Sequence, residues 1–181
     1  MEHKHLEKQD ITKDKNYDLR FSFLIDENFL LEVLNDPETM KWFPPSTESD
    51  VKIFARNWAG FSRYSASLTA IYGKETIGMA TLFLMPYVKV AHLAMMYIVV
   101  KKEYRNKGVG KSLLKNINNL AKTKFKLESL HVEIFEGCPL EYVLPKVGYK
   151  KIITQENFVE LDNKMKARMI YEVNLLKDVD E

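Results

Sequence analysis

The sequence contains one cysteine, Cys138, no long apolar run and no strong excess of charge of either sign. A single cysteine excludes a disulfide within the chain and a cysteine-based metal site, and it fits a reducing compartment. The apolar runs fall well short of the roughly 20 residues that span a bilayer, and residues 1–18 are too polar for a signal peptide. We therefore expect a cytoplasmic protein with no metal site and no membrane partner.

The net formal charge of +2 argues against a general nucleic-acid-binding protein. The charge is nevertheless uneven, because residues 101–126 contain nine Lys or Arg and one acid, Glu103. One anionic ligand bound beside this segment would explain the local excess. The alternative is a helix face whose lysines are simply solvated.

The chain also lacks repeats, low-complexity tracts and a Pro/Gly/Ser linker that would divide it. We expect a loose polar N-terminal tail over residues 1–16 and a single domain over residues 17–181, which is long enough for one sizeable core.

The apolar patterns predict a mixed α+β domain. Strands are expected near 18–25, 65–72, 76–84, 91–100, 129–135, 149–160 and 168–175. Helices are expected near 27–35, 108–124 and 139–146, and another from an N-cap within 46–49 to about residue 60. Two adjacent prolines exclude regular structure around residues 42–45. This order of elements suits a mostly antiparallel sheet of six to seven strands rather than a doubly wound parallel sheet.

A candidate phosphate-binding loop, Arg105–Gly110 (Arg-Asn-Lys-Gly-Val-Gly), separates the buried-strand pattern of residues 94–100 from the amphipathic helix. At a helix start the first N–H groups have no intrahelical partner and the helix dipole is positive, so main chain alone can bind an anion. The glycines allow close approach. Arg105 and Lys107 would add charge, and Arg105 could grip a phosphate through two parallel hydrogen bonds.

These residues resemble the signature of the GNAT superfamily of N-acetyltransferases, in which a hydrophobic strand leads to an Arg/Gln-x-x-Gly-x-Gly/Ala loop. Lys111–Leu114 continues the match, Leu130–Ile134 resembles the next strand of the family, and Lys146–Tyr149 resembles the Lys-x-Gly-Phe that closes the following helix. The resemblance covers about Asp18–Leu175. It implies an α/β/α domain with a splayed central sheet, and transfer of an acetyl group from acetyl-CoA directly to a primary amine on a small molecule or a protein N-terminus.

The resemblance also implies where acetyl-CoA lies. Its pantetheine would bond to main chain where two neighbouring strands splay, and its pyrophosphate would meet the N–H groups of the glycine loop. The implied cofactor-binding residues are Ile98, Val99, Val100, Arg105, Asn106, Lys107, Gly108, Val109, Gly110, Lys111 and Ser112.

Acetyl transfer needs a base that takes a proton from the amine and an acid that protects the leaving thiolate. Glu133 matches the glutamate that serves as base, directly or through water, in some relatives; the alternative is an exposed strand glutamate. The position of the family's usual tyrosine acid is Leu144 here, so the nearby Tyr142 is the candidate acid or a packed aromatic. His131 and His92 are further base candidates from their chemistry, or ordinary strand and surface residues.

The segment Asp36–Pro44 resembles the first-helix region of ribosomal-protein and related N-acetyltransferases, which helps to shape the acceptor site. Trp42, Phe43, Trp58 and Tyr87 are therefore candidates for lining a substrate groove, with core packing as the alternative.

Other functions stay open at this point. Gly108–Ser112 resembles the end of a nucleotide-binding P-loop, although the first glycine of that motif falls at Arg105. A non-catalytic acyl-CoA sensor on the same fold is favoured by the tyrosine missing at Leu144. Cys138 lacks a partner pattern for a nucleophile. An edge strand could support a homodimer, and the identity of the acceptor stays open.

Overall fold

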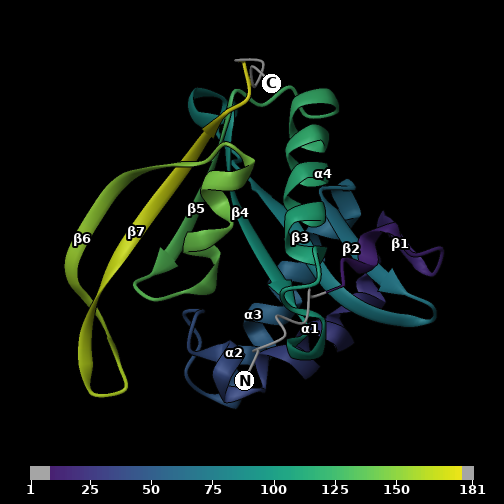
Figure 1. The fold of residues 1–181 in the computed structure, drawn as a ribbon. Coiled ribbons are helices and arrows are strands. Elements are labelled where there is room, and N and C mark those ends of the chain that lie inside the picture. The colour runs from purple at the N-terminus through teal and green to yellow at the C-terminus, as the bar shows by residue number, and fades with distance from the viewer. Residues whose placement is uncertain (1–8, 177–181) are drawn as a thin grey trace, which may run out of the picture.

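The computed structural model describes residues 9–176 and forms one seven-stranded sheet in the order β1-β2-β3-β4-β5-β7-β6 (Figure 1). The strands are β1 (Tyr17–Phe21), β2 (Ser67–Tyr72), β3 (Glu75–Leu84), β4 (Leu93–Val100), β5 (Ser129–Phe135), β6 (Lys150–Leu161) and β7 (Lys164–Asn174). The α-helices are α1 (Glu27–Leu34), α2 (Pro37–Met40), α3 (Glu48–Gly60) and α4 (Val109–Thr123). The short 3₁₀ helices are η1 (Ile11–Lys13), η2 (Leu24–Asp26), η3 (Phe61–Tyr64), η4 (Val88–Val90), η5 (Lys102–Tyr104), η6 (Pro139–Tyr142) and η7 (Leu144–Val147).

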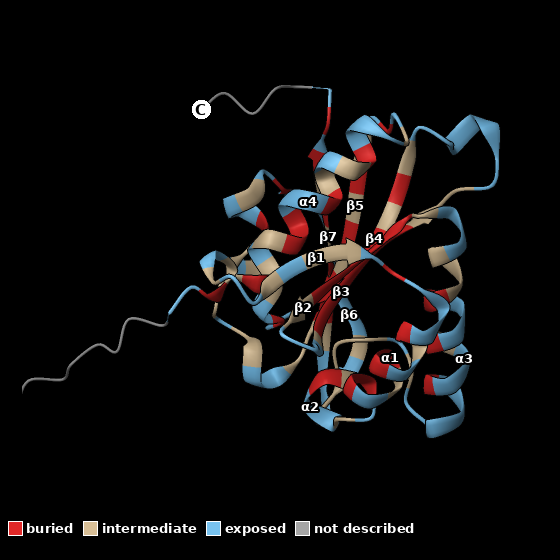
Figure 2. Cartoon of the chain, turned by 90° about the vertical axis from the view of Figure 1, so that its right-hand side faces the viewer, coloured by how far each residue is buried: buried red, intermediate tan, exposed pale blue. Residues whose placement is uncertain are grey.

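Every neighbouring pair of strands is antiparallel except β4 and β5. The predicted α+β fold with a mostly antiparallel sheet is therefore confirmed. Helix α4 covers one face of this sheet, and α1 and α3 cover the other (Figure 2). Because side chains alternate along a strand, Met96 and Ile98 of β4 pack toward α4, whereas Tyr97 and Val99 pack toward α1 and α3.

Local sequence explains most element ends. Thr47 caps α3 by accepting a hydrogen bond from the N–H of Asp50, whose side chain bonds back to the Thr47 N–H. A two-residue turn at Gly73 (φ 62°) joins β2 to β3, and Asp162 and Asn163, both with positive φ, join β6 to β7.

Three predicted elements differ from the structure. The strand expected over 18–25 ends at Phe21, and η2 begins at Leu24. The last strand, expected from residue 168, begins at Lys164 as β7. Pro37 follows the end of α1 at Leu34 and opens the single turn of α2, since its fixed φ suits the first helical position. The helix expected over 139–146 is split into η6 and η7, because Pro145 lacks the N–H that a continuous α-helix needs.

The N-terminal segment up to Asn16, expected to be loose, packs against the domain from Asp10 onward. Ile11 is buried, and its N–H donates to the Lys107 carbonyl at 3.2 Å. The Tyr72 hydroxyl donates to Asp14 at 3.0 Å. A buried apolar residue with a paired backbone explains the order, while residues 1–8 of the expected tail lie outside the described residues.

Strands β4 and β5 diverge soon after they meet. They pair only at Leu93–Met95 of β4 and Ser129–His131 of β5, although β4 continues to Val100 and β5 to Phe135. Beyond Met95, the edge of β4 that faces β5 therefore has no ladder partner in the described sheet. The expected splay is present, and it opens the cleft described below.

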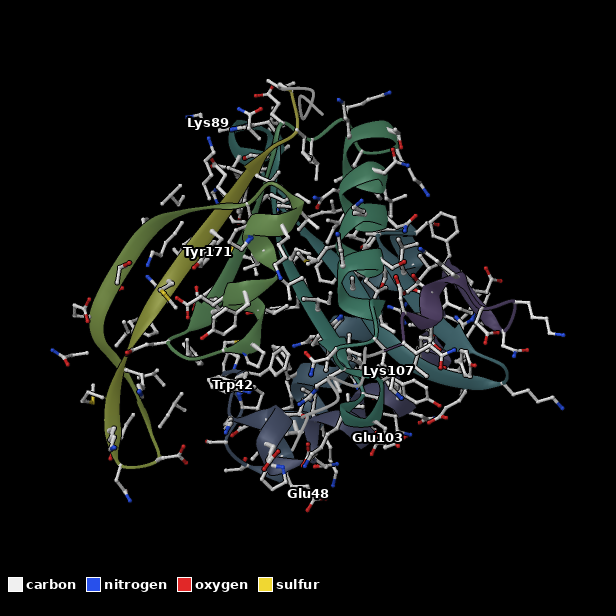
Figure 3. All side chains as sticks on the ribbon, viewed as in Figure 1. Trp42, Glu48, Lys89, Glu103, Lys107 and Tyr171 are labelled. Carbon is white, nitrogen blue, oxygen red and sulfur yellow. The ribbon has the colours of Figure 1, made fainter. Side chains whose placement is uncertain are left out.

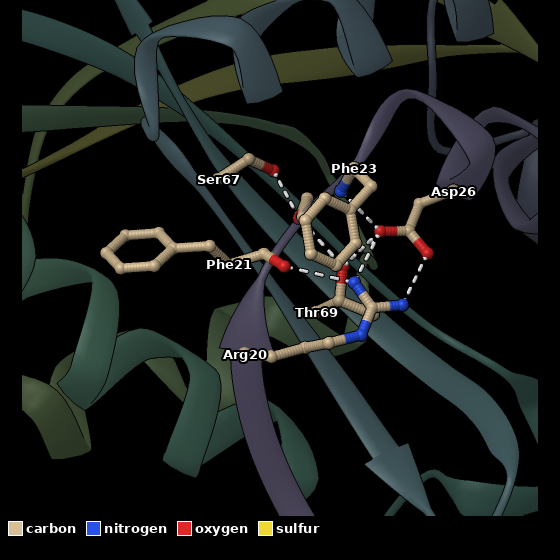
Figure 4. A network of polar contacts seen from close by, with 7 residues as sticks. Arg20, Phe21, Phe23, Asp26, Ser67 and Thr69 are labelled. Atoms are coloured by element: carbon tan, nitrogen blue, oxygen red, sulfur yellow. Dashed lines mark hydrogen bonds and ion pairs between the residues drawn. The ribbon is translucent and has the colours of Figure 1, made fainter.

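A buried polar network supports the opposite end of this sheet (Figure 4). Arg20 makes two 2.8 Å hydrogen bonds to the carboxylate of Asp26, which also accepts from the Phe23 N–H and the Thr69 hydroxyl. Asp26 is only 4% exposed. Burial raises the pKa of the Asp26 carboxyl, but the bonds from Arg20, Phe23 and Thr69 together outweigh that effect and hold the pKa below its ordinary value.

We expect Asp26→Asn to lower the free energy of unfolding at pH 7 by about 3 kcal/mol, because it leaves the guanidinium of Arg20 without its charged partner. A carboxyl whose pKa is lower in the folded state stabilises the protein above the unfolded pKa, and this contribution is lost as pH falls below about 4. The difference between wild type and variant should therefore shrink between pH 7 and pH 3. Urea denaturation at both pH values measures it. Asp18→Asn, at an exposed position on β1, is the control and should change stability little at either pH.

Candidate active site

The divergence of β4 and β5 opens a cleft of about 270 Å³. Its walls come from five parts of the chain. Three are Met96–Val100 of β4, Val132–Ile134 of β5, and the loop and helix start between Arg105 and Lys111. The other two form a cap, with Thr39, Trp42 and Phe43 from one segment and Cys138, Pro139, Leu140 and Val143 from the other. Residues far apart in sequence thus enclose one space, and most of its lining is apolar.

The mouth of the cleft is suited to an anion. Asn106 (φ 60°) and Gly108 (φ 86°) both adopt left-handed conformations, and Gly108 is the residue before α4. Such alternation turns successive N–H groups toward one point, where they join the unpaired N–H groups of the first helical turn. A Cβ added to Gly110 would meet only Val100 Cγ2 at 3.9 Å, so its backbone is open to a ligand. This loop fits the phosphates of a nucleotide-like cofactor.

The structure places the predicted cofactor residues in two groups. The cleft is lined by Ile98, Val99, Val100, Arg105, Asn106, Gly108, Gly110 and Lys111. The other three predicted residues, Lys107, Val109 and Ser112, do not line it. Val109, the first residue of α4, is wholly buried in the core. The Lys107 ammonium lies 5.4 Å from the ring centre of Tyr104, near the start of α4 (Figure 3).

Arg105 was expected to bind a phosphate, but in the structure its guanidinium is hydrogen-bonded to protein groups. Its Nε donates to the Val100 carbonyl at 3.0 Å and one Nη donates to the Thr39 hydroxyl at 2.6 Å. Arg105 therefore joins the end of β4 to α2 across the cleft mouth, and these two bonds replace the two-pronged phosphate grip expected from sequence. Thr39 lies within the segment Asp36–Pro44 noted in the sequence, but its contact with Arg105, 66 residues further along the chain, could not be identified there.

Glu133 projects into the cleft from β5 and is held in place by an ion pair. Its Oε2 lies 3.3 Å from an Nη of Arg168 on β7. Arg168 also donates to the side-chain oxygen of Gln155 and lies 4.3 Å from the ring centre of Phe158. The carboxylate is thus fixed in orientation at the cleft wall.

Tyr97 is a cleft residue that the sequence analysis missed. The parallel register pairs Met95 with His131, so counting two residues further along each strand places Tyr97 and Glu133 on the same sheet face, on opposite sides of the cleft. Burial, and then the negative charge of Glu133, raise the pKa of the Tyr97 hydroxyl above its usual value. This phenol keeps its proton at neutral pH. A single tyrosine in an otherwise aliphatic strand was the available signal.

The structure does not bring Tyr142 into the cleft. Its side chain is 73% exposed, whereas Leu140 and Val143 on either side line the cleft. Residues three apart lie above one another in a 3₁₀ helix, so Leu140 and Val143 share the inner face around η6 and Tyr142 points outward.

The histidine and cysteine candidates also lack catalytic geometry. His131 bonds through Nε2 to Glu172 at 2.7 Å and does not line the cleft, and His92 is exposed before β4. Cys138 lines the cleft, but burial raises the pKa of its thiol to about 11. The thiol stays protonated and is a poor nucleophile.

Two of the four candidate groove aromatics are in place. Trp42 and Phe43 line the cleft, and Trp42 also approaches Gly137 beyond the end of β5 (Figure 3). Trp58 is fully buried and donates to the Thr81 hydroxyl at 2.7 Å, so it belongs to the core. Tyr87 is 73% exposed in the β3–β4 connection, at the end of β4 remote from the cleft.

Within residues 9–176, no three His, Cys, Asp or Glu side chains are grouped to hold a metal ion. Across the same described part of the chain, no helix combines the length and the apolar character needed to cross a bilayer.

The sequence model of the Acetyltransferase (GNAT) family matches residues 28–137, more than half of the chain. The chain belongs to this family. The match contains α1 to β5 and therefore both strands of the cleft and the glycine loop. The resemblance noted in the sequence is confirmed. No curated protein sequence matches this chain.

Solved acetyltransferase structures share the fold. A Salmonella typhimurium protein assigned as an acetyltransferase and solved with its cofactor acetyl-CoA is 12% identical, with 92% of this chain and 98% of that chain covered and a TM-score of 0.78. A ribosomal-protein-alanine N-acetyltransferase from Brucella melitensis is 18% identical, with 87% and 99% covered and a TM-score of 0.75. An N-acetyltransferase from Staphylococcus aureus Mu50 is 21% identical, with 89% and 99% covered and a TM-score of 0.74. At these identities the similarity shows a common fold.

Proposed function

We propose that this GNAT protein is an N-acetyltransferase that moves an acetyl group from acetyl-CoA directly to a primary amine. The observation that carries the proposal is the cleft between β4 and β5, which has a glycine loop and a helix start suited to an anion at its mouth and is lined further in by a carboxylate, Glu133, and a phenol, Tyr97. The P-loop alternative is not favoured, because the chain belongs to the GNAT family and its sheet is mostly antiparallel.

The chain offers two kinds of cofactor contact. Main-chain groups of Ile98–Val100 that face the diverging β5 have no strand partner on that side, so they can bond to the amides of a pantetheine arm. The first N–H groups of α4, with Gly108 and Gly110, bind the pyrophosphate, and Lys111 adds charge at the rim. Bound acetyl-CoA supplies the acetyl group as a thioester.

The reacting groups come from the two strand walls. Glu133 accepts the proton of the incoming amine, directly or through one water, so that the nitrogen lone pair can attack. Tyr97 donates its phenolic proton toward the sulfur that leaves. Arg168 keeps the Glu133 carboxylate turned into the cleft and is a positioning residue. We assign Tyr142 no catalytic role, because it is exposed on the outer side of η6.

The test is a thermal-shift titration with acetyl-CoA, CoA and Mg-ATP in parallel, followed by thiol release with a panel of amines. At 100 times Kd, a ligand bound only by the folded state adds about 2.7 kcal/mol, which for a domain of this size raises Tm by roughly 5–10 °C. We expect such a shift with both CoA species, no shift with Mg-ATP, and amine-dependent thiol release. Binding without release would favour the acyl-CoA sensor, and stabilisation by Mg-ATP alone would contradict the proposal.

A further inference from the structure

A second cavity, of about 240 Å³, adjoins the cleft on the side of α2. One wall is the connection from α2 to α3, with Phe43, Pro44 and Pro45. The other wall is the end of β5 and the arm formed by β6 and β7, with Phe135 and Leu161. The long β6–β7 arm extends past the rest of the sheet toward this region in Figure 1. The cavity thus lies between two segments that are far apart in sequence.

Two observations connect this cavity with the cleft. Phe43 lines both spaces, so they adjoin at this side chain. Glu133 and Phe135 are two residues apart on β5 and face the same side of the sheet, Glu133 in the cleft and Phe135 in the second cavity. Alternate residues of a strand are about 7 Å apart, so the apolar cavity begins one short step from the carboxylate that would receive the amine.

The charges near the cavity limit what can bind there. Among the described residues that line the cleft, Glu133 is the sole carboxylate, and it already pairs with Arg168. The second cavity has one acid, Glu160, and one base, Lys41, and otherwise consists mostly of proline, aromatic and aliphatic side chains. A polyamine, which carries several ammonium groups, would need more carboxylates than this lining presents.

We propose that the second cavity holds the apolar body of the acceptor, so that the substrate is a small primary amine carried on an aliphatic or aromatic group. This inference rests on the proposed acetyltransferase function. The amine lies beside Glu133, and its apolar body passes Phe43 and packs against Phe135 and Leu161. Burial of that body supplies the binding free energy, since the hydrophobic effect scales with apolar area removed from water.

Thiol release in the presence of acetyl-CoA tests the class of acceptor, with hexylamine and 2-phenylethylamine compared with spermidine and lysine. We expect kcat/KM to be at least about tenfold higher for the two apolar amines. Calorimetric titration of 2-phenylethylamine into CoA-saturated protein should show binding in the absence of turnover. If spermidine or lysine is the better substrate, the inference is wrong and the acetyltransferase function stands.

Leu161→Trp tests the cavity itself, because the larger ring fills it. KM for 2-phenylethylamine should rise roughly tenfold while Kd for acetyl-CoA stays unchanged, since Leu161 does not line the cleft. The matched control is Ile152→Trp on the same strand, at an exposed position that lines neither space. Val159→Phe fills the same cavity and replaces Leu161→Trp if that variant does not fold. An unchanged KM in a folded cavity variant would overturn the inference. Failure of the wild-type protein to bind acetyl-CoA would instead overturn the proposed function.

Discussion

Gly110→Glu should abolish measurable acetyl-CoA binding. Gly110 lies in the first turn of α4 and lines the cleft, where the backbone N–H groups and the helix dipole favour an anion. A glutamate there would occupy the space of the cofactor and place a negative charge close to its phosphates. One charge pair about 4 Å apart near a protein surface is worth about 4 kcal/mol, so Kd should rise roughly 1,000-fold.

Calorimetry measures the affinity, and Gly110→Ala is the matched control. The Cβ of alanine would lie 3.9 Å from Val100 Cγ2, an ordinary contact, so this variant should fold and keep most of its affinity. Gly108→Glu should also prevent binding. This variant tests the phosphate loop less directly, because at φ 86° any side chain strains the backbone and a Cβ would collide with Asp10. If folded Gly110→Glu binds acetyl-CoA with unchanged affinity, the assignment of this loop to phosphate binding is wrong.

Glu133→Gln should lower kcat for acetyl transfer at neutral pH roughly 100-fold, since a positioned general base contributes 10²–10⁴-fold and water takes over part of its task. Glutamine keeps an oxygen that can accept from Arg168, so the wall of the cleft is preserved. Acetyl-CoA affinity should therefore stay within about twofold of wild type. With the base removed, the residual rate should increase with pH as more of the amine loses its proton.

Steady-state thiol release across pH, together with calorimetry, provides both readouts. Glu172→Gln is the control, because Glu172 bonds to His131 on the neighbouring strand and does not line the cleft. It should leave kcat near the wild-type value. If Glu133→Gln turns over as fast as wild type, Glu133 is a structural partner of Arg168 and the proton passes to water alone.

Much of the fold could be read from local patterns. The apolar spacing in α4, the apolar run of β4 and the glycine turn at Gly73 predicted their elements because each pattern reports a period, a composition or a backbone conformation of its own segment. The errors arose at element ends, as where β1 stops at Phe21, and at Pro145, which divides the helix predicted over 139–146. Pro37 starts a helical turn and Pro145 interrupts one, and which of these a proline does depends on its neighbours in space.

Part of the candidate site could likewise be predicted from sequence and part could not. The glycine loop between a buried strand and an amphipathic helix was visible in sequence, since the strand, the loop and the helix are contiguous. Tyr142 was proposed for its closeness in sequence to a family position, but the 3₁₀ geometry of η6 turns it outward. Tyr97 and Glu133 line one cleft because β4 and β5 diverge after Met95, and no local pattern reports where two strands part.

The sequence by itself determined the family, the α+β fold and the glycine loop that opens α4, because these follow from contiguous periodicity and from two glycines. The tertiary structure alone decided that Arg105 joins β4 to Thr39, that Tyr97 and Glu133 share one cleft, and that a second apolar cavity lies beyond Phe43. Those contacts join residues tens of positions apart. Their geometry depends on how the sheet, the α2–α3 connection and the β6–β7 arm pack together, which is a property of the whole chain.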